Sequence, residues 1–345
     1  MDFLTIRRPD DFHLHLRDQV IMKNVVQDTA RQFARAIVMP NLKRPITTVQ
    51  QALLYRQRIL DCLPENNHFE PLMTLYLTDN ISVDEISGVA DSEYIHAVKY
   101  YPAGSTTNSN LGVTDIKKVY PVLEKMEELG IPLLIHGEVA DPDVDSFDRE
   151  KVFINLVLEP LLHHFKSLKL VFEHITTQEA VEFVMDSPQT VAATITPQHI
   201  MFNRNRLFKD GLSPHYYCLP VLKRERHRHA VMHAAVSGHP SFFLGTDSAP
   251  HIRQDKESSC GCAGIYSAHS AIEFYAEVFD RAGCLDKLEQ FASVNGASFY
   301  GLPVNSGTIN LIKESWTIPS TLSLGDDELI PLMAGEEIHW KLEYR

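Results

Sequence analysis

Short apolar runs that end in a side chain suited to metal binding recur along this chain of 345 residues. Residues Pro132–Ile135 lead directly into His136, and residues Phe242–Thr246 lead into Asp247. Buried parallel strands are typically such runs of Val, Ile, Leu and Phe. In an α/β barrel the carboxyl ends of the strands share one face, where active-site residues lie. The pattern therefore predicts parallel strands whose ends bring ligand-type side chains to one site.

Eight strand-like runs can be counted, and segments with helical periodicity lie between them. The expected strands cover 4–7 with an extension at 12–16, 35–40, 70–78, 95–101, 132–137, 168–175, 191–197 and 241–246. The expected helices cover 47–61, 114–129, 149–165, 176–187, 223–237 and 264–282. In the second of these helices Thr114 is the expected N-cap, and Pro121 predicts a kink or a late start.

Regular alternation of strand and helix predicts the α/β class and a (β/α)8 TIM barrel. Such barrels typically span about 250 residues, and residues 4–285 fit that size with modest insertions. An open doubly wound sheet is the alternative, but no glycine-rich phosphate-binding fingerprint follows an early strand. Residues 300–345 contain short mixed apolar runs with prolines, which predict a C-terminal extension packed on the barrel. We expect residues 1–345 to form one domain.

The overall charge and the cysteine content exclude several classes of protein. Lys and Arg number 32 and Asp and Glu number 45, so the net charge is −13, whereas nucleic-acid binding needs a basic footprint. The sequence has no window of about 18 apolar residues, so it predicts no membrane span. The N-terminal sequence lacks the pattern of a signal peptide. The five cysteines are odd in number and sparse, which favours reduced thiols in a cytoplasmic protein.

His13 and His15 lie two residues apart, and in a strand this spacing places both imidazoles on one face. They could bind one metal ion together, although such a pair alone is weak evidence. The surrounding sequence FHLHLRD, residues 12–18, is more specific. His136 and His174 are isolated, and their weight comes from the recurrence of such side chains at the ends of separate strands.

Lys99 stands at a strand end but cannot bind a cation as an ammonium, because it then has no lone pair. Burial between histidines and metal would favour the neutral amine. A neutral amine can react with carbon dioxide to give a carbamate, which resembles a carboxylate and could bridge two metal ions. Alternatively, the lysine binds a substrate anion directly. The residues alone leave both possibilities open.

Asp247 follows an apolar run and precedes Ser248-Ala249-Pro250-His251. An aspartate beside a metal ion can ligate it and shuttle a proton. Alternatively, Asp247 is the N-cap of the next helix. His251 is expected to be a pocket residue and not a ligand.

Other histidines and cysteines favour ordinary structural roles. His227, His229 and His233 belong to an expected helix rich in Lys and Arg, which favours a solvated outer face. Cys260 and Cys262 lack the paired spacing of a structural zinc site. We expect them in a loop whose backbone amides lie near the pocket.

At the level of motifs the chain resembles the dihydroorotases of the amidohydrolase superfamily, specifically the shorter, stand-alone bacterial type. The resemblance extends over essentially the whole chain. The most specific stretches are RRPDDFHLHLRD (7–18), RAIVMPNL (35–42), KYYPAGSTTNS (99–109), PLLIHGE (132–138), VFEHITT (171–177), ATITPQHIMFNRN (193–205), FLGTDSAPH (243–251), KESSCGCAG (256–264) and SVNGASFYGLPVN (293–305).

The resemblance implies two zinc ions per subunit. His13, His15 and Asp247 would hold the more buried ion, and His136 and His174 would hold the more exposed one. Zinc suits ligation by histidine, although cobalt or manganese could substitute for it.

By the same resemblance, Lys99 would be carboxylated at Nζ and would bridge both ions together with a hydroxide. The implied activity is the reversible cyclisation of N-carbamoyl-L-aspartate to L-dihydroorotate and water, in pyrimidine (UMP) biosynthesis. The hydroxide would be the nucleophile in the hydrolytic direction, and Asp247 would be the general acid and base.

The resemblance also implies how the substrate is held. Arginine suits a carboxylate because its fork makes bidentate hydrogen bonds, and small polar residues with Gly104 suit the loop 103–110 to a role as a mobile lid. The implied contacts are Arg17, Asn41 and His251 to the substrate carboxylate, backbone atoms of Leu219 and Ala263 to the pyrimidine ring, and Thr106 and Thr107 on the lid.

Two other functions compete with this interpretation. A hydantoinase or dihydropyrimidinase would act on related rings that lack the carboxylate, and the predicted anion-binding residues argue against it. A catalytically silent homologue would have lost ligands, and all six are present. The resemblance further implies a homodimer in which each subunit has a complete active site.

Overall fold

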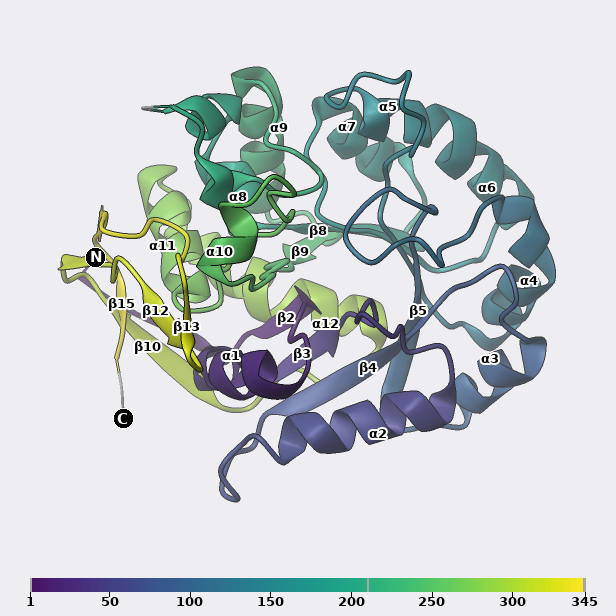
Figure 1. Ribbon diagram of the computed structural model, residues 1–345, viewed down its shortest axis with the longest axis horizontal. Helices are drawn as coiled ribbons and strands as arrows, with labels where there is room; N and C mark the ends of the chain where they lie inside the picture. Colours follow the sequence, from purple (N-terminus) through teal and green to yellow (C-terminus); the bar gives the residue numbers. More distant parts are fainter. Residues whose placement is uncertain (1, 210, 344–345) are drawn as a thin grey trace.

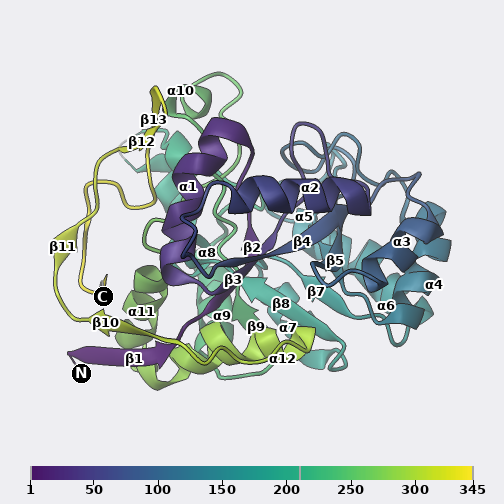
Figure 2. The ribbon, with the colours of Figure 1, turned by 90° about the horizontal axis from the view of Figure 1, so that it is seen from below.

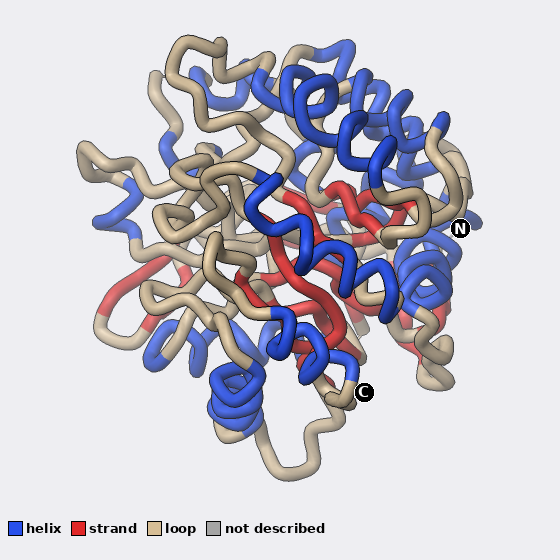
Figure 3. Tube along the Cα trace, turned by 90° about the vertical axis from the view of Figure 1, so that its right-hand side faces the viewer, coloured by secondary structure: helices blue, strands red, loops and turns tan. Residues whose placement is uncertain are grey.

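The computed structural model describes residues 2–209 and 211–343, and its centre is an eight-stranded parallel sheet in the order β2 to β9. Helices surround these strands (Figures 1 and 3). The expected (β/α)8 barrel is confirmed. The strands are β2 (Asp10–Leu14), β3 (Arg35–Val38), β4 (Glu70–Tyr76), β5 (Ile95–Tyr100), β6 (Leu133–Ile135), β7 (Leu170–Phe172), β8 (Val191–Ile195) and β9 (Phe242–Leu244).

Several of the helices begin at polar caps. The side chains of Thr48, Ser82 and Thr177 each accept a hydrogen bond from a backbone N–H in the first turn of the helix that follows. This N–H would otherwise have no partner within the helix. None of the described helices is both long and apolar enough to cross a membrane. They are α1 (Gln19–Gln32), α2 (Val49–Leu60), α3 (Val83–Ala90), α4 (Tyr120–Leu129), α5 (Arg149–Phe153), α6 (Glu159–His164), α7 (Gln178–Asp186), α8 (Pro197–Met201), α9 (Glu225–Val236), α10 (Arg253–Lys256), α11 (Ala271–Arg281) and α12 (Asn295–Tyr300).

Several expected boundaries are wrong. Residues 4–7 do not belong to the barrel, because β1 (Phe3–Arg7) pairs antiparallel with β10 (Thr308–Ile312) instead. The cap expected at Thr114 is Asp115, whose side chain accepts from Lys117 N at the start of a short 3-10 turn. Helices α1 and α3 were not among those expected, and the helix expected from residue 264 begins only at α11.

The proline in the helix expected over 114–129 produces the late start and not the kink. The α-helical segment α4 begins at Tyr120, with Pro121 in its first turn. At this position the missing N–H of proline costs nothing, because the first N–H groups of a helix have no partner within it.

One helix that the sequence placed on a solvated outer face is partly buried. His227 of α9 is buried, and its Nδ1 accepts the backbone N–H of Gln178, at 3.1 Å. Lys223, just before α9, is also buried. His229 and His233 are exposed, as expected. The basic residues of this segment therefore do not all face solvent.

The C-terminal segment lies against the start of the chain. Strand β10 pairs with β1 on one side and with β15 (Lys341–Leu342) on the other, and β1 and β10 lie side by side in Figure 2. Trp340 is fully buried, and its indole N–H donates to Asp280 of α11, at 3.2 Å. Four shorter strands complete this region: β11 (Trp316–Thr317), β12 (Leu322–Leu324), β13 (Asp327–Leu329) and β14 (Glu337–Ile338).

The inside of the barrel has an apolar layer with a polar layer above it. Because side chains alternate along a strand, the residue two positions after an inward-facing one also faces inward, nearer the carboxyl end. This rule places Lys99, His136 and Glu173 directly above the apolar layer. That layer takes one residue from each strand: Phe12, Ile37, Leu72, Ala97, Leu134, Val171, Ala192 and Phe243.

Helix α12 covers the lower end of this apolar layer. The Phe12 ring stacks on Tyr300 of α12, with ring centroids 5.1 Å apart. A Cβ added to Gly296 would lie 2.2 Å from the Phe12 ring. Glycine at this position therefore lets the helix approach the barrel closely.

Replacing this glycine should destabilise the fold. We expect Gly296→Ala to lower the free energy of unfolding by about 1–2 kcal/mol, because overpacking outweighs the gain in helix propensity. Urea unfolding followed by circular dichroism measures the change. Gly307→Ala is the control, since nothing lies within 4 Å of a Cβ there. Equal stability of the two variants would contradict the packing argument.

Candidate active site

The barrel closes between β2 and the segment after β9, and the site is built on this junction. Asp247 N donates to His13 O at 2.9 Å, and His15 N donates to Ser248 O at 3.1 Å. The buried carboxylate of Asp11 accepts from the backbone N–H groups of His13 and Thr246, at 3.1 and 2.9 Å. The backbone of two predicted ligands, His13 and Asp247, is therefore fixed by the closure of the barrel.

Three predicted site residues have a positive φ, a backbone conformation that residues other than glycine rarely adopt. The φ angles of Arg17, His174 and Asp247 are 59°, 43° and 47°. Such conformations cost of order 1–3 kcal/mol each and are often found at functional sites. For His174 the reason is geometric. Glu173 occupies the inward position of the strand alternation, so the chain must turn for the His174 ring also to face the site.

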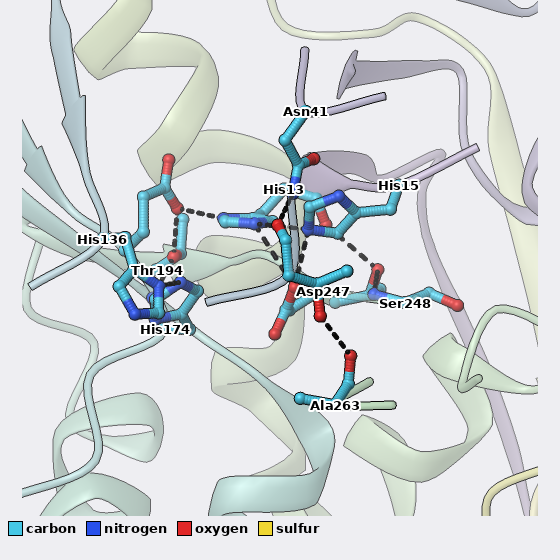
Figure 4. Close-up of polar contacts among 12 residues, drawn as sticks. His13, His15, Asn41, His136, His174, Thr194, Asp247, Ser248 and Ala263 are labelled. Atoms are coloured by element: carbon cyan, nitrogen blue, oxygen red, sulfur yellow. Dashed lines mark hydrogen bonds and ion pairs between the residues drawn. The ribbon is translucent and has the colours of Figure 1, made fainter. Parts of the chain in front are cut away.

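His13, His15 and Asp247 form the first cluster. His15 Nε2 lies 3.0 Å from Asp247 Oδ1, and His13 Nε2 lies 3.4 Å from the same oxygen and 3.4 Å from His15 Nε2. All three side chains are buried. Figure 4 shows them turned toward one another. Two imidazole nitrogens and one carboxylate oxygen around a common point are a donor set that suits zinc.

His136 and His174 form a second pair beside the first cluster. His136 Nδ1 lies 3.2 Å from His174 Nε2, and both side chains are buried. The two groups are adjacent, because the ring centroids of His13 and His174 are 5.0 Å apart. Figure 4 shows the pair next to Thr194, on the side of His13 away from His15. The arrangement offers two neighbouring positions for metal ions.

Lys99 lies fully buried among these groups. Within residues 2–209 and 211–343, its Nζ has no hydrogen-bond partner. Burial lowers the pKa of the Lys99 ammonium to about 8, although the charges of Glu173 and Asp247 act in the opposite direction. A buried amine without a partner is unfavourable, and both a carbamate bridging two ions and a direct contact with an anion would satisfy it. The residues therefore fit a two-metal centre.

Burial also sets the protonation of the histidines. It lowers the pKa of His13 and His174 well below the ordinary value and lowers the pKa of His15 as well, and the nearby Lys99 acts in the same direction. These rings are therefore neutral near pH 7, with one nitrogen lone pair each. A neutral imidazole is the form that binds a metal ion. The cluster is prepared for metal binding without losing protons from these rings.

Arg17, with His251 beside it, gives the site a cationic edge. Arg17 Nε donates to Pro250 O at 3.2 Å, and its Nη2 lies 2.9 Å from His251 Nε2. His251 Nε2 also lies 3.0 Å from Ala263 O. Burial and the nearby Arg17 lower the pKa of His251 well below its ordinary value. The guanidinium is therefore the positive charge of this edge, and it suits an anionic group of a substrate.

The loop at 103–110 lies over the pocket. Thr107 Oγ1 donates to Ala263 O at 3.2 Å, and Asn41 Nδ2 donates to Thr107 O at 3.1 Å. Asn108 Nδ2 donates back to Asn41 O at 2.9 Å. These contacts join the loop to two other walls of the pocket.

The predicted site residues come together in one place. Lys99 is fully buried and His251 contacts Arg17, and neither of them lines the pocket. All other predicted metal and substrate residues line the pocket itself: His13, His15, Arg17, Asn41, Thr106, Thr107, His136, His174, Leu219, Asp247 and Ala263.

Sequence reasoning missed several residues of this site. Glu173 lies beside His13, Glu138 lies beside His136, and Tyr101 lines the pocket. The alternation of side chains could have indicated two of them, because Glu173 and Tyr101 follow inward-facing strand positions by two and four residues.

Comparison with known proteins agrees with this site. The model of the amidohydrolase family matches residues 10–322, so the chain belongs to that family. Highly similar relatives within the family are dihydroorotases. That of Nitrosomonas europaea is 63% identical over 343 residues, covering 99% of this chain and 98% of the relative. That of Cupriavidus necator is 61% identical and covers 98% of each chain.

Solved structures give the same result. A dihydroorotase from Saccharomyces cerevisiae, in complex with 5-fluoroorotic acid, superposes with a TM-score of 0.92 at 33% identity and 99% coverage of both chains. One from Campylobacter jejuni has a TM-score of 0.91 at 34% identity, covering 100% of this chain and 98% of that one. An L-hydantoinase from Arthrobacter aurescens shares the fold, with a TM-score of 0.80 at 14% identity over 98% of this chain and 83% of the other. The chain is a dihydroorotase-type amidohydrolase.

Zinc should stabilise the metal-free protein. A ligand that binds only the folded state contributes about 2.7 kcal/mol per site at one hundred times its Kd, so we expect added zinc to raise the Tm. His15→Asn should lose a large part of this rise, because it removes a ligand from the first cluster. Differential scanning calorimetry measures the shift, with the exposed His68 replaced by Asn as the control. A Tm that zinc leaves unchanged would contradict the assignment of the cluster.

Proposed function

We propose that this chain catalyses the reversible cyclisation of N-carbamoyl-L-aspartate to L-dihydroorotate and water, a step of pyrimidine biosynthesis. The observation that carries the proposal is the position of Arg17 and His251 beside the two histidine clusters around Lys99. A cyclic amide that carries a carboxylate needs both parts: a site that activates water and an adjacent cation. The full-length dihydroorotase relatives support the same reaction.

Six side chains would hold two zinc ions in each subunit. When bound, the ions would polarise the amide carbonyl and lower the pKa of a water molecule. Lys99, carboxylated at Nζ, would link the two halves of the ligand set, and its burial without a partner supports this role. The other ligands would be His13, His15 and Asp247 on one side and His136 and His174 on the other.

Asp247 would move the proton during the reaction. In ring opening, its carboxylate accepts a proton from the attacking water and then delivers it to the ring nitrogen as that nitrogen departs. In cyclisation the same two transfers run in reverse. The backbone hydrogen bond from Asp247 to His13 would fix the backbone that carries this carboxylate.

The remaining pocket residues would hold and enclose the substrate. Arg17, Asn41 and His251 would bind the carboxylate, and backbone atoms of Leu219 and Ala263 would contact the ring. The loop that contains Thr106 and Thr107 would close over the substrate and exclude water. The hydrogen bond from Thr107 to Ala263 supports this role, because it joins the loop to the opposite wall.

A hydantoinase or dihydropyrimidinase activity is the alternative. Its substrates lack the carboxylate, so Arg17 would have no anionic partner in the pocket. The hydantoinase structure mentioned above is 14% identical to this chain, and that similarity concerns the fold alone. We therefore favour the dihydroorotase reaction.

The assembly, the location and the partners expected from the sequence stay predictions. We propose a homodimer in the cytoplasm, with each subunit containing a complete site and with the small-molecule substrate as its partner. The net charge of −13 argues against binding to nucleic acid.

The first test is hydrolysis of L-dihydroorotate by the purified, zinc-loaded protein. We expect robust activity, and we expect Lys99→Ala to abolish it because the variant lacks the group that links the two halves of the site. An absorbance assay of ring opening measures both. Lys118→Ala, at an exposed lysine on the surface, is the control. Full activity in Lys99→Ala, or none in the wild type, would overturn the proposal.

A second test concerns the substrate carboxylate. Arg17→Gln removes a charge-assisted hydrogen bond worth about 1.5–3 kcal/mol, so we expect KM for L-dihydroorotate to rise by roughly 10–100-fold. Steady-state kinetics with dihydroorotate and dihydrouracil measure the preference, and the variant should discriminate less between them. Arg58→Gln is the control, because Arg58 pairs with Asp18 and does not line the pocket. An unchanged KM would show that the arginine does not bind the substrate.

A further inference from the structure

We infer that two glutamates outside the predicted ligand set, Glu173 and Glu138, are positioning residues that preset one histidine at each metal position. The inference rests on the proposed function, because it assumes the two-metal site. Each glutamate contacts a different histidine, and the two histidines belong to different clusters. The first cluster and the second pair would therefore each contain one ring held by a carboxylate.

Glu173 holds His13. Its Oε2 accepts a hydrogen bond from His13 Nδ1 at 2.8 Å, and both side chains are buried. Thr194 Oγ1 donates to the same oxygen at 2.5 Å and so fixes the carboxylate from the neighbouring strand. When Glu173 is ionised, its carboxylate can only accept, so the proton of the neutral His13 ring lies on Nδ1. The lone pair is then on Nε2, the atom that faces His15 and Asp247.

Glu138 holds His136 in the opposite tautomer. Its Oε2 lies 3.1 Å from His136 Nε2, and both side chains are buried. The proton must therefore lie on Nε2, which leaves the lone pair on Nδ1, the atom that faces His174. Gly137 lies between the two residues, where an added Cβ would be 2.1 Å from the Phe172 ring. The backbone that carries this pair is thus packed tightly against the barrel wall.

The other two histidines lack such a partner. Nδ1 of His15 and Nδ1 of His174 are buried and make no hydrogen bond within the part of the chain that the structure describes. Each metal position therefore combines one ring that a carboxylate holds with one ring that no carboxylate holds. Carboxylate partners of metal-binding histidines fix the ring orientation and make the ligand more basic, and their loss typically costs about 10–100-fold in metal affinity.

The test compares the zinc affinity of Glu173→Gln and Glu138→Gln with that of the wild type, by competition with a chromophoric chelator. We expect the wild type to bind two zinc ions. In each variant we expect the Kd of one ion to rise by about 10–100-fold while the other stays near the wild-type value. Glu173→Asp, which keeps the carboxylate, should recover part of the affinity that Glu173→Gln loses.

The control is Glu273→Gln in α11, another buried glutamate, which accepts from Leu342 N at 3.3 Å. We expect it to lower the Tm of the metal-free protein without changing the affinity for zinc. A merely structural role for Glu173 or Glu138 would give the same result as this control and would overturn the inference. Glu173→Gln and Glu138→Gln are tested separately, so if one variant fails to fold, the zinc affinity of the other still tests the inference.

The outcomes separate this inference from the proposed function. If the wild type binds two zinc ions and hydrolyses L-dihydroorotate while both glutamine variants keep full zinc affinity, the inference fails and the function stands. If the wild type binds zinc tightly but has no activity on dihydroorotate, the proposed reaction fails, and loss of affinity in the variants still supports the inference.

Discussion

Closure of the barrel between β2 and the segment after β9 is the constraint on which the rest of the site depends. The backbone hydrogen bond from Asp247 N to His13 O closes the sheet. It also sets the spacing between these two predicted ligands. Asp11 reinforces the junction by accepting from His13 and Thr246, and it does so while fully buried. The backbone positions of the first cluster are thus a consequence of the fold, and the rotation of flexible side chains contributes little to its geometry.

The alternation of side chains then explains why a hydrophobic barrel contains so many ionisable groups. The apolar layer lies toward the amino end of the strands, and Lys99, His136 and Glu173 lie one repeat above it. Desolvation at this depth disfavours charge on His13, His174 and Lys99. The site therefore presents neutral nitrogen ligands and an unpartnered amine to incoming metal ions, and the energetic cost of burying these groups is offset when they bind.

Much of this could be predicted from the sequence, and the failures have physical reasons. The runs leading to His136, His174 and Asp247 predicted the presence of β6, β7 and β9 correctly, because burial on both faces of a parallel strand leaves a clear apolar run. Each of these strands ends two or three residues earlier than expected. The assignment of residues 4–7 to the barrel was wrong because β1 is equally apolar but pairs with β10, more than 300 residues away in the chain. His227 was misjudged because its packing against α7 depends on a neighbour that its own helix does not reveal.

The sequence by itself determined the fold class, the six candidate ligands and the family, because these depend on local patterns and on motifs that stay together along the chain. Only the tertiary structure decided which ring nitrogen of His13 and His136 faces the site and that Glu173 and Glu138 lie behind them. It also decided that His174 reaches the site through a positive φ. These features depend on contacts between different strands and loops, and their distances are set by barrel closure, which no single segment of the chain encodes.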